Sequence, residues 1–144
     1  MSIEAPSITA EILLLEQSIE DAALIQDAVE NSHVTVLTEC PDILTFLHRQ
    51  GKYANAPRPD LILLDLDLSK KEDCEMLAEI KKSPQLKRIP VVVLASSISY
   101  EDIYQAYDLH ANAYICKPAD AEEFAHIIRA TLHFWLALVR LPKD

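Results

Sequence analysis

The chain has 144 residues, which is enough for one domain with a sizeable hydrophobic core. Half of the residues are hydrophobic, which argues against disorder, and the net charge of −10 disfavours nucleic-acid binding, which needs a basic surface. No apolar run approaches membrane-spanning length, and the first residues lack the charged start and apolar core of a secretory signal. We therefore expect a cytoplasmic protein whose scattered cysteines are reduced thiols: Cys40, Cys74 and Cys116.

The first predicted elements form a strand–helix unit. The run EILLLE at 11–16 is apolar and ends in an acid, which is typical of a buried strand. A helix is predicted over 19–32, because Ala22, Ile25 and Val29 fall on one helical face. Ser18 directly precedes this helix and is a residue type that caps helix N-termini.

A second unit follows. The β-branched run VTVLT at 34–38 predicts a short strand, and the apolar spacing of 42–50 predicts a helix. Gly51, the only glycine, stands where the C-cap of that helix belongs. The residues after it, KYANAPRP, contain two prolines and predict a loop.

The stretch PDLILLDLDLS at 59–69 carries the chemistry that we predict for this chain. Leu61–Leu64 is a run of four aliphatic residues, as in a strand buried on both faces of a parallel sheet. Asp65 stands at the carboxyl end of this strand, where open α/β sheets bind their ligands. Because a carboxylate is costly to bury there without a cation or donors, we expect Asp65 to face such groups rather than only to cap a turn.

The rest of the chain repeats the alternation of helices and strands. The apolar spacing near residue 105 directs Ile103, Ala106 and Tyr107 inward. The remaining predicted elements are helices at 73–82, 99–110 and 119–139 and strands at 90–95 and 112–116.

Five strands alternating with five helices predict one α/β domain over 1–144. Its expected form is a flavodoxin-like, doubly wound five-stranded parallel sheet of strand order 2-1-3-4-5, with helices on both faces. In that order the carboxyl ends of the strands share one rim. The residues expected to converge there are Glu16, Gln17, Asp65, Ala95, Ser96 and Lys117.

Four motifs, by their order and spacing, resemble the receiver domain of two-component response regulators: LLLEQ at 13–17, LILLDLDL at 61–68, VVVLASS at 91–97 and YICKP at 114–118. Other segments, such as LKRIPVVVLASS and FWLALVRLP, look similar to the small single-domain regulators that partner cyanobacterial phytochromes. The resemblance implies a phosphoacceptor signalling domain rather than an enzyme. It also implies a sensor histidine kinase as phosphoryl donor, with a phytochrome as the candidate, and a downstream protein partner.

The same resemblance implies roles for the rim residues. Asp65 would accept the phosphoryl group, and Lys117 would pair with the phosphoryl oxygens. Mg²⁺ would be held by Glu16, Gln17, Asp65 and the backbone carbonyl of Asp67. Mg²⁺ and a lysine neutralise the charge that otherwise keeps a carboxylate from attacking a dianionic phosphoryl group.

Four positions depart from the family pattern: Ser69 replaces a usual Pro, Cys74 replaces a usual Gly, and Gln17 and Ala95 touch the phosphoryl site directly. Gln17 stands where the family usually has a second acidic metal ligand, so weaker Mg²⁺ binding is expected. Ala95 replaces a Thr or Ser whose hydroxyl couples the phosphoryl group to an aromatic switch, here Tyr114. Ser96 is adjacent, but regular strand alternation directs its side chain to the opposite face. A pseudo-receiver, which is read by its partner without phosphorylation, is therefore the alternative function.

The closing helix carries more apolar surface than one sheet can cover. Its apolar residues beyond position 133 point around the helix rather than to one side, which predicts burial against a second copy of the chain. The alternative is that the tail folds back on its own domain. The residues expected in the homodimer interface are Phe134, Trp135, Leu138 and Leu141.

A flavodoxin-like enzyme or nucleotide binder is a third candidate function. The composition argues against it, because a chain with one glycine contains neither a GxGxxG loop nor a P-loop. Mg²⁺-dependent phosphorylation by a small phosphodonor separates the first two candidates. No nucleic-acid or membrane partner is expected.

Overall fold

The computed structural model describes residues 10–142, so the ends of the predicted domain, 1–9 and 143–144, lie outside the described residues. Five strands form one parallel sheet in the order β2-β1-β3-β4-β5, which confirms the predicted fold class. The strands are β1 Glu11–Leu15, β2 His33–Leu37, β3 Leu61–Asp65, β4 Val91–Ala95 and β5 Ala113–Cys116. The helices are α1 Ile19–Ala28, α2 Cys40–Leu47, α3 Lys71–Lys82, α4 Tyr100–Asp108 and α5 Ala121–His133, with a 3₁₀ turn η1 at Gly51–Tyr53 and a π-helical turn η2 at Phe134–Leu138.

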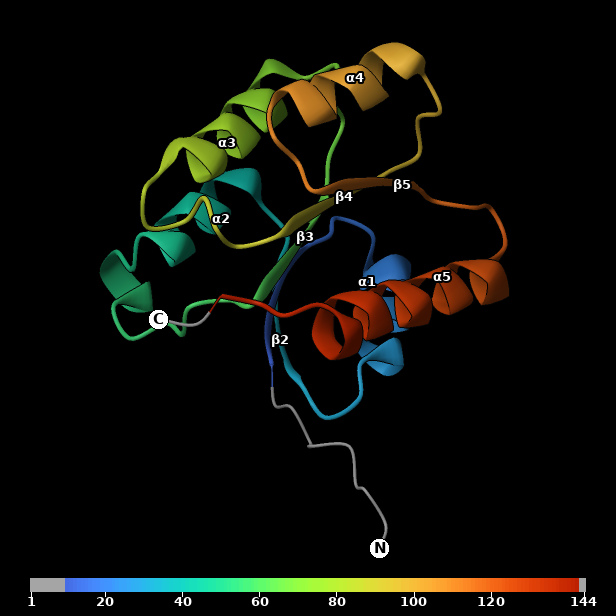
Figure 1. The fold of residues 1–144 in the computed structure, drawn as a ribbon, viewed down its shortest axis with the longest axis horizontal. Coiled ribbons are helices and arrows are strands. Elements are labelled where there is room, and N and C mark those ends of the chain that lie inside the picture. The colour runs from blue at the N-terminus through green and yellow to red at the C-terminus, as the bar shows by residue number, and fades with distance from the viewer. Residues whose placement is uncertain (1–9, 143–144) are drawn as a thin grey trace, which may run out of the picture.

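The sheet is covered by helices on both faces. Helices α1 and α5 lie on one face, and α2, α3 and α4 lie on the other (Figure 1). Strand β3 contributes to both cores, because Leu61 and Leu63 pack under α1 and α5 whereas Ile62 and Leu64 pack on the other side. The aliphatic run Leu61–Leu64 is therefore buried on both faces of the sheet, as predicted.

The parallel register brings four strand ends to one rim. Leu15 pairs with Leu64, Asp65 with Leu94, and Ala95 with Cys116. The residues that follow β1, β4 and β5 therefore leave the sheet beside the end of β3. This register is what positions the candidate site.

Helices α1 and α2 both end before the predicted position. Helix α1 stops at Ala28 rather than at residue 32, because Val29 is extended and Asn31 has a φ of 59°. Gly51 is not the C-cap of α2, which ends at Leu47. Arg49 takes the left-handed conformation there, with a φ of 53°, and its N–H and Nε donate to the carbonyls of Phe46 and Ala56.

Helix α4 packs through a smaller residue than predicted. Ala106 is fully buried, but Tyr107 is 48% exposed, so its predicted inward position is wrong. The reason is that α4 approaches the sheet edge over its small alanine and leaves the tyrosine at the margin. There the Tyr107 hydroxyl accepts a hydrogen bond from the N–H of Tyr114 on β5.

The closing helix is divided in two. Helix α5 begins after Asp120, whose carboxylate accepts from the N–H of Glu123, and it changes into the π-helical turn at Phe134. The chain is extended from Val139, whose N–H donates to the carbonyl of Phe134. Within residues 10–142, no helix is long and apolar enough to span a bilayer.

Candidate functional site

Lys117 is the centre of the polar cluster at the rim. Its backbone N–H donates to the carbonyl of Ala95 at 2.8 Å, which fixes the start of the loop after β5. Its Nζ lies 2.8 and 3.0 Å from the two carboxylate oxygens of Glu16, 3.0 Å from Asp21 Oδ2 and 3.2 Å from Asp65 Oδ1. The side chain is only 9% exposed, so one nearly buried ammonium group faces three carboxylates.

Glu16 is the buried partner of this lysine. Its side chain is completely inaccessible, and besides the two contacts with Lys117 it accepts a hydrogen bond from the N–H of Ser18. Burial raises the pKa of Glu16 to about 7, and the neighbouring Asp65 adds to the rise, which Lys117 opposes. Burial by itself would lower the pKa of Lys117, but the hydrogen bond with Glu16 and the charge of Asp65 outweigh it and raise that pKa.

Asp65 opens onto a shallow cavity of about 350 Å³. The residues that line it come from the loops after β1, β3 and β4 and from the first turn of α3: Gln17, Asp65, Leu66, Asp67, Lys70, Asp73, Ser96 and Ser97. Glu16 and Lys117 are not part of this lining. The rim therefore has an inner layer, where Lys117 holds Glu16, and an open layer that a ligand can reach.

The oxygens of the open layer are suited to a hard cation. Gln17, Asp65 and Asp67 line the cavity, and among them they carry an amide oxygen, carboxylate oxygens and the Asp67 carbonyl, which accepts from the Lys70 N–H. Mg²⁺ prefers such oxygen ligands and retains several waters. Within residues 10–142, however, no three acidic, histidine or cysteine side chains are arranged to hold a metal.

Glu16 does not join the predicted metal set in this arrangement. Both of its oxygens are bonded to Lys117, and its side chain is buried away from the cavity. Its role here is to hold the lysine, so that of the predicted ligands the Asp65 carboxylate, the Gln17 amide oxygen and the Asp67 carbonyl remain for a cation.

Ser96 lines the same cavity as Asp65. Strand β4 ends at Ala95, so side-chain alternation no longer applies one residue later. Ala95 itself is buried in the core under α3 and α4. Tyr114 is joined to the same loop, because its hydroxyl donates to the carbonyl of Ser97 at 2.8 Å.

The loop between β3 and α3 is organised by two aspartates. The Asp67 carboxylate accepts from the N–H and the hydroxyl of Ser69, and these bonds lower its pKa. The Asp67 N–H donates in turn to Asp73 Oδ2 at 2.8 Å.

Sequence reasoning missed Asp21 and Asp73 as parts of the site. Both stand in the first turn of a helix that follows a rim strand. An acidic residue there is also explained by the favourable interaction with the helix dipole, so its type alone does not indicate a site. The signal that was available is positional: the first turn after a strand–loop connection lies beside the rim.

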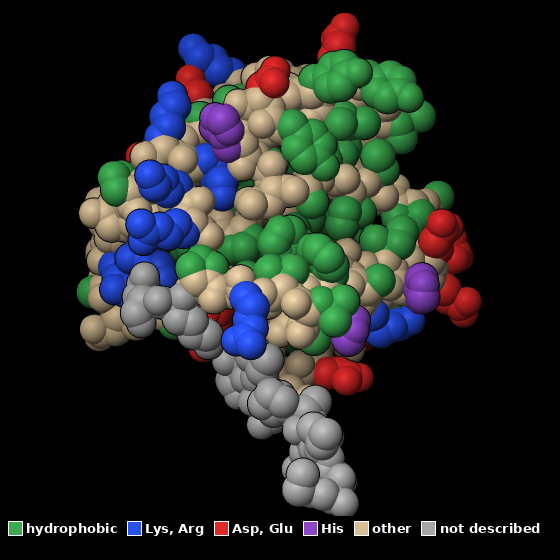
Figure 2. Space-filling view, in the orientation of Figure 1, with side chains coloured by type: hydrophobic (Ala, Val, Ile, Leu, Met, Phe, Trp, Pro, Cys, Tyr) green, Lys and Arg blue, Asp and Glu red, His purple; other side chains and the backbone are tan. Residues whose placement is uncertain are grey.

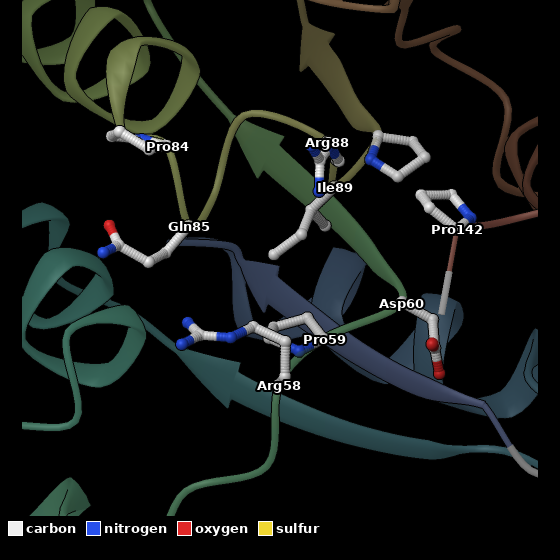
Figure 3. Close-up of a pocket in the computed structure, with 9 residues that line it drawn as sticks. Arg58, Pro59, Asp60, Pro84, Gln85, Arg88, Ile89 and Pro142 are labelled. Atoms are coloured by element: carbon white, nitrogen blue, oxygen red, sulfur yellow. The ribbon is translucent and has the colours of Figure 1, made fainter. Parts of the chain in front are cut away.

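A second cavity of about 380 Å³ lies at the opposite edge of the sheet, by the amino ends of β3 and β4 (Figure 3). Arg58 and Asp60 line it, but both already bind the chain itself: Arg58 Nη1 donates to the Leu47 carbonyl, and Asp60 Oδ2 accepts from the Glu11 N–H. Asp65 and Lys117 take no part in it, so the candidate site is the rim cavity.

The comparison with family models decides what this rim belongs to. Residues 12–129 match the model of the response regulator receiver domain. The chain belongs to that family. Receivers are phosphoacceptor signalling domains of two-component systems rather than enzymes, and the matched range runs from the second residue of β1 through β5 and contains every rim residue described above.

Individual relatives extend the likeness over almost the whole receiver. The response regulator Rcp1 of Synechocystis sp. is 43% identical over 135 residues, which are 91% of this chain and 92% of Rcp1. A crystal structure of the phosphorylated cyanobacterial phytochrome response regulator RcpA has a TM-score of 0.88 at 44% identity and covers 94% of this chain and 100% of RcpA. The Mn²⁺-bound form of Rcp1 has a TM-score of 0.86 at 41% identity, covering 93% and 99%.

Proposed function

We propose that this receiver accepts a phosphoryl group on Asp65 from a sensor histidine kinase, with a phytochrome as the candidate, and signals through protein contacts. The observation that carries the proposal is the position of Asp65, which opens onto the rim cavity while its Oδ1 lies 3.2 Å from Lys117 Nζ. Similarity to regulators named for phytochromes, one of them in phosphorylated form, supports the choice of donor.

The transfer requires little from the protein beyond position and charge. An oxygen of the Asp65 carboxylate attacks the phosphorus of the phosphohistidine, the phosphorus–nitrogen bond breaks, and the imidazole keeps the electron pair. Lys117 lies close enough to neutralise charge on the incoming oxygens. Mg²⁺, when bound, would supply further neutralisation, and Gln17, Asp65 and the Asp67 carbonyl are the groups that would hold it.

Mass spectrometry of the intact protein tests this assignment. After incubation with acetyl phosphate and Mg²⁺, the wild type should gain one phosphoryl group and Asp65→Asn none. Asp102→Asn, a change of the same kind in the first turn of α4, is the matched control and should be modified like the wild type. A phosphorylated Asp65→Asn protein would remove the assignment.

The pseudo-receiver is the second candidate, and specific features favour it. Gln17 brings no charge to the cavity, Ala95 has no hydroxyl, and Lys117 is already engaged by Glu16 and Asp21. A chain of this kind would present one fixed surface to its partner. The absence of any added phosphoryl, with acetyl phosphate and with a cognate kinase alike, would favour this function over the first.

A further inference from the structure

The rim cavity contains a carboxylate that none of the predicted roles uses. Asp73 reaches back from the first turn of α3 and lines the cavity together with Asp65. Its Oδ2 accepts the backbone N–H of Asp67 at 2.8 Å, and its Oδ1 lies 3.6 Å from the thiol of Cys40. An anion of the chain itself therefore holds an amide donor at the mouth of the phosphoacceptor site.

A phosphoryl group on Asp65 would need the donors that face this cavity. It brings negatively charged oxygens next to the loop after β3, and a hydrogen bond to an ionised acceptor is stronger than a neutral one. The Asp67 N–H belongs to that loop, two residues beyond Asp65, and is the amide that Asp73 occupies. Further donors among the lining residues include the ammonium group of Lys70, the hydroxyl of Ser96 and the backbone N–H groups of Ser96 and Ser97.

We propose that Asp73 is an internal competitor of the phosphoryl group: its carboxylate occupies the Asp67 N–H and must leave before a phosphoryl group on Asp65 takes that donor. This inference rests on the proposed function, because it assumes that Asp65 is the acceptor. Charge adds to the competition, since a carboxylate and a phosphoryl group in one cavity repel each other. Asp73 thereby slows the loading of Asp65 and shortens the life of the loaded state.

Two substitutions separate the charge of Asp73 from its hydrogen bond. Asp73→Asn removes the charge but keeps an acceptor of similar shape, whereas Asp73→Ala removes both. Glu72→Gln is the matched control, because Glu72 is an exposed acid in the same first turn of α3 but does not line the cavity. It therefore reports the general effect of removing one negative charge from that helix end.

The experiment follows phosphoryl uptake from acetyl phosphate with Mg²⁺ by intact mass, and the binding of beryllofluoride by fluorine NMR. Asp73→Ala should load on the order of tenfold faster than the wild type and bind beryllofluoride more tightly by a similar factor. Asp73→Asn should fall between the two, and Glu72→Gln should stay within about twofold of the wild type. Amide exchange at Asp67 gives an independent reading, since its N–H should exchange faster in Asp73→Ala without ligand.

The outcomes that overturn the proposal are distinct. If the wild type and Asp73→Ala load at the same rate, Asp73 does not compete, although Asp65 is still the acceptor. If both Asp73 variants load more slowly and also bind Mn²⁺ more weakly than the wild type, Asp73 assists a cation instead. If no protein takes up a phosphoryl group or beryllofluoride, the proposed function fails, and the competitor role fails with it because removing Asp73 gives no gain.

Discussion

At the scale of single residues, the rim depends on the sharing of Lys117 between carboxylates. Its ammonium group lies within 3.2 Å of oxygens on Glu16, Asp21 and Asp65. A charge buried as deeply as Glu16 is costly unless it is paired and hydrogen-bonded. Lys117 therefore stabilises the fold through Glu16 and also lies ready to pair with charge that arrives at Asp65.

The contribution of Lys117 to stability can be measured by removing its ammonium group. Lys117→Met leaves Glu16 buried without a cation and should lower the free energy of unfolding by about 3–5 kcal/mol. Adding Glu16→Gln should recover much of the loss, because the orphaned charge is then absent. Urea denaturation of the two variants and the wild type checks this. A double variant no more stable than Lys117→Met would contradict the role of Glu16 as the buried partner.

The raised pKa of Glu16 also predicts how stability changes with pH. In the folded protein that pKa is about 7, above its ordinary value of 4.5, so between these values the folded state binds more protons than the unfolded state. Stability from this group is therefore fully present below about pH 4.5 and is lost as pH rises through about 7.

The difference in free energy of unfolding between wild type and Glu16→Gln, measured without divalent cations, should shift against the wild type as the pH rises from 5 to 8, a range chosen to bracket the raised pKa. A constant difference across that range would show that Glu16 does not titrate there.

Gln17 sets the charge of the open layer. It lines the cavity beside Asp65 but contributes only an amide oxygen, so a divalent cation there meets less negative charge than a carboxylate would give. Gln17→Asp should tighten Mn²⁺ or Mg²⁺ binding by roughly 1–3 kcal/mol, as charge-assisted contacts usually do. Calorimetric titration measures the gain, with Glu20→Gln as a control for general charge on the neighbouring exposed turn. Unchanged affinity would mean that the side chain does not face the metal.

At the scale of elements, the sequence predicts what depends on a regular pattern. The run at 61–64 indicates a strand buried on both faces because every one of its side chains is aliphatic, and Ser18 indicates a helix start because its hydroxyl accepts the Asp21 N–H. Strand order follows from the alternation of strands with helices. The position of Asp65 at the rim follows in turn from that order and the parallel register.

What the sequence did not predict depends on where an element stops. Ser96 lines the cavity from the position directly after β4, where the regular alternation of strand side chains has already ended. Arg49 takes the left-handed turn near Gly51, where its N–H donates to the Phe46 carbonyl and its Nε to the Ala56 carbonyl. Asp21 contacts Lys117 from a distant part of the chain, and Asp73 reaches Asp67 across the loop before α3. Their place in the first turn of a helix after a rim strand is a signal of position but does not identify these partners.

At the scale of the whole molecule, the apolar surface is unevenly distributed. Hydrophobic side chains gather on the part of the visible face that carries α4, β5 and the end of α5, whereas most Lys and Arg lie on the left of the view, over α2 and α3 (Figures 1 and 2). The end of the chain contributes Phe134, which is 49% exposed, and Leu138, which is 65% exposed. Trp135 and Leu136 instead pack partly against the core under α5. Of the predicted interface residues, Phe134 and Leu138 therefore face outward and Trp135 faces inward, while Leu141 is half-buried.

This division sharpens the prediction that the chain forms a homodimer through its closing helix. Burying an exposed Phe or Leu side chain contributes about 1.5–3 kcal/mol each, and a two-fold contact counts every residue twice.

Sedimentation at tens of micromolar, a range on the order of weak protein affinities, should show a dimer for the wild type. Phe134→Asp with Leu138→Asp should give a folded monomer, and Ile19→Asp, a charge placed on exposed apolar surface of α1, should leave the dimer intact. Trp135→Asp should lower stability as well, because that ring packs on its own core. A wild type that stays monomeric would remove the prediction. A Phe134→Asp, Leu138→Asp variant that still dimerises would show that the contact lies elsewhere.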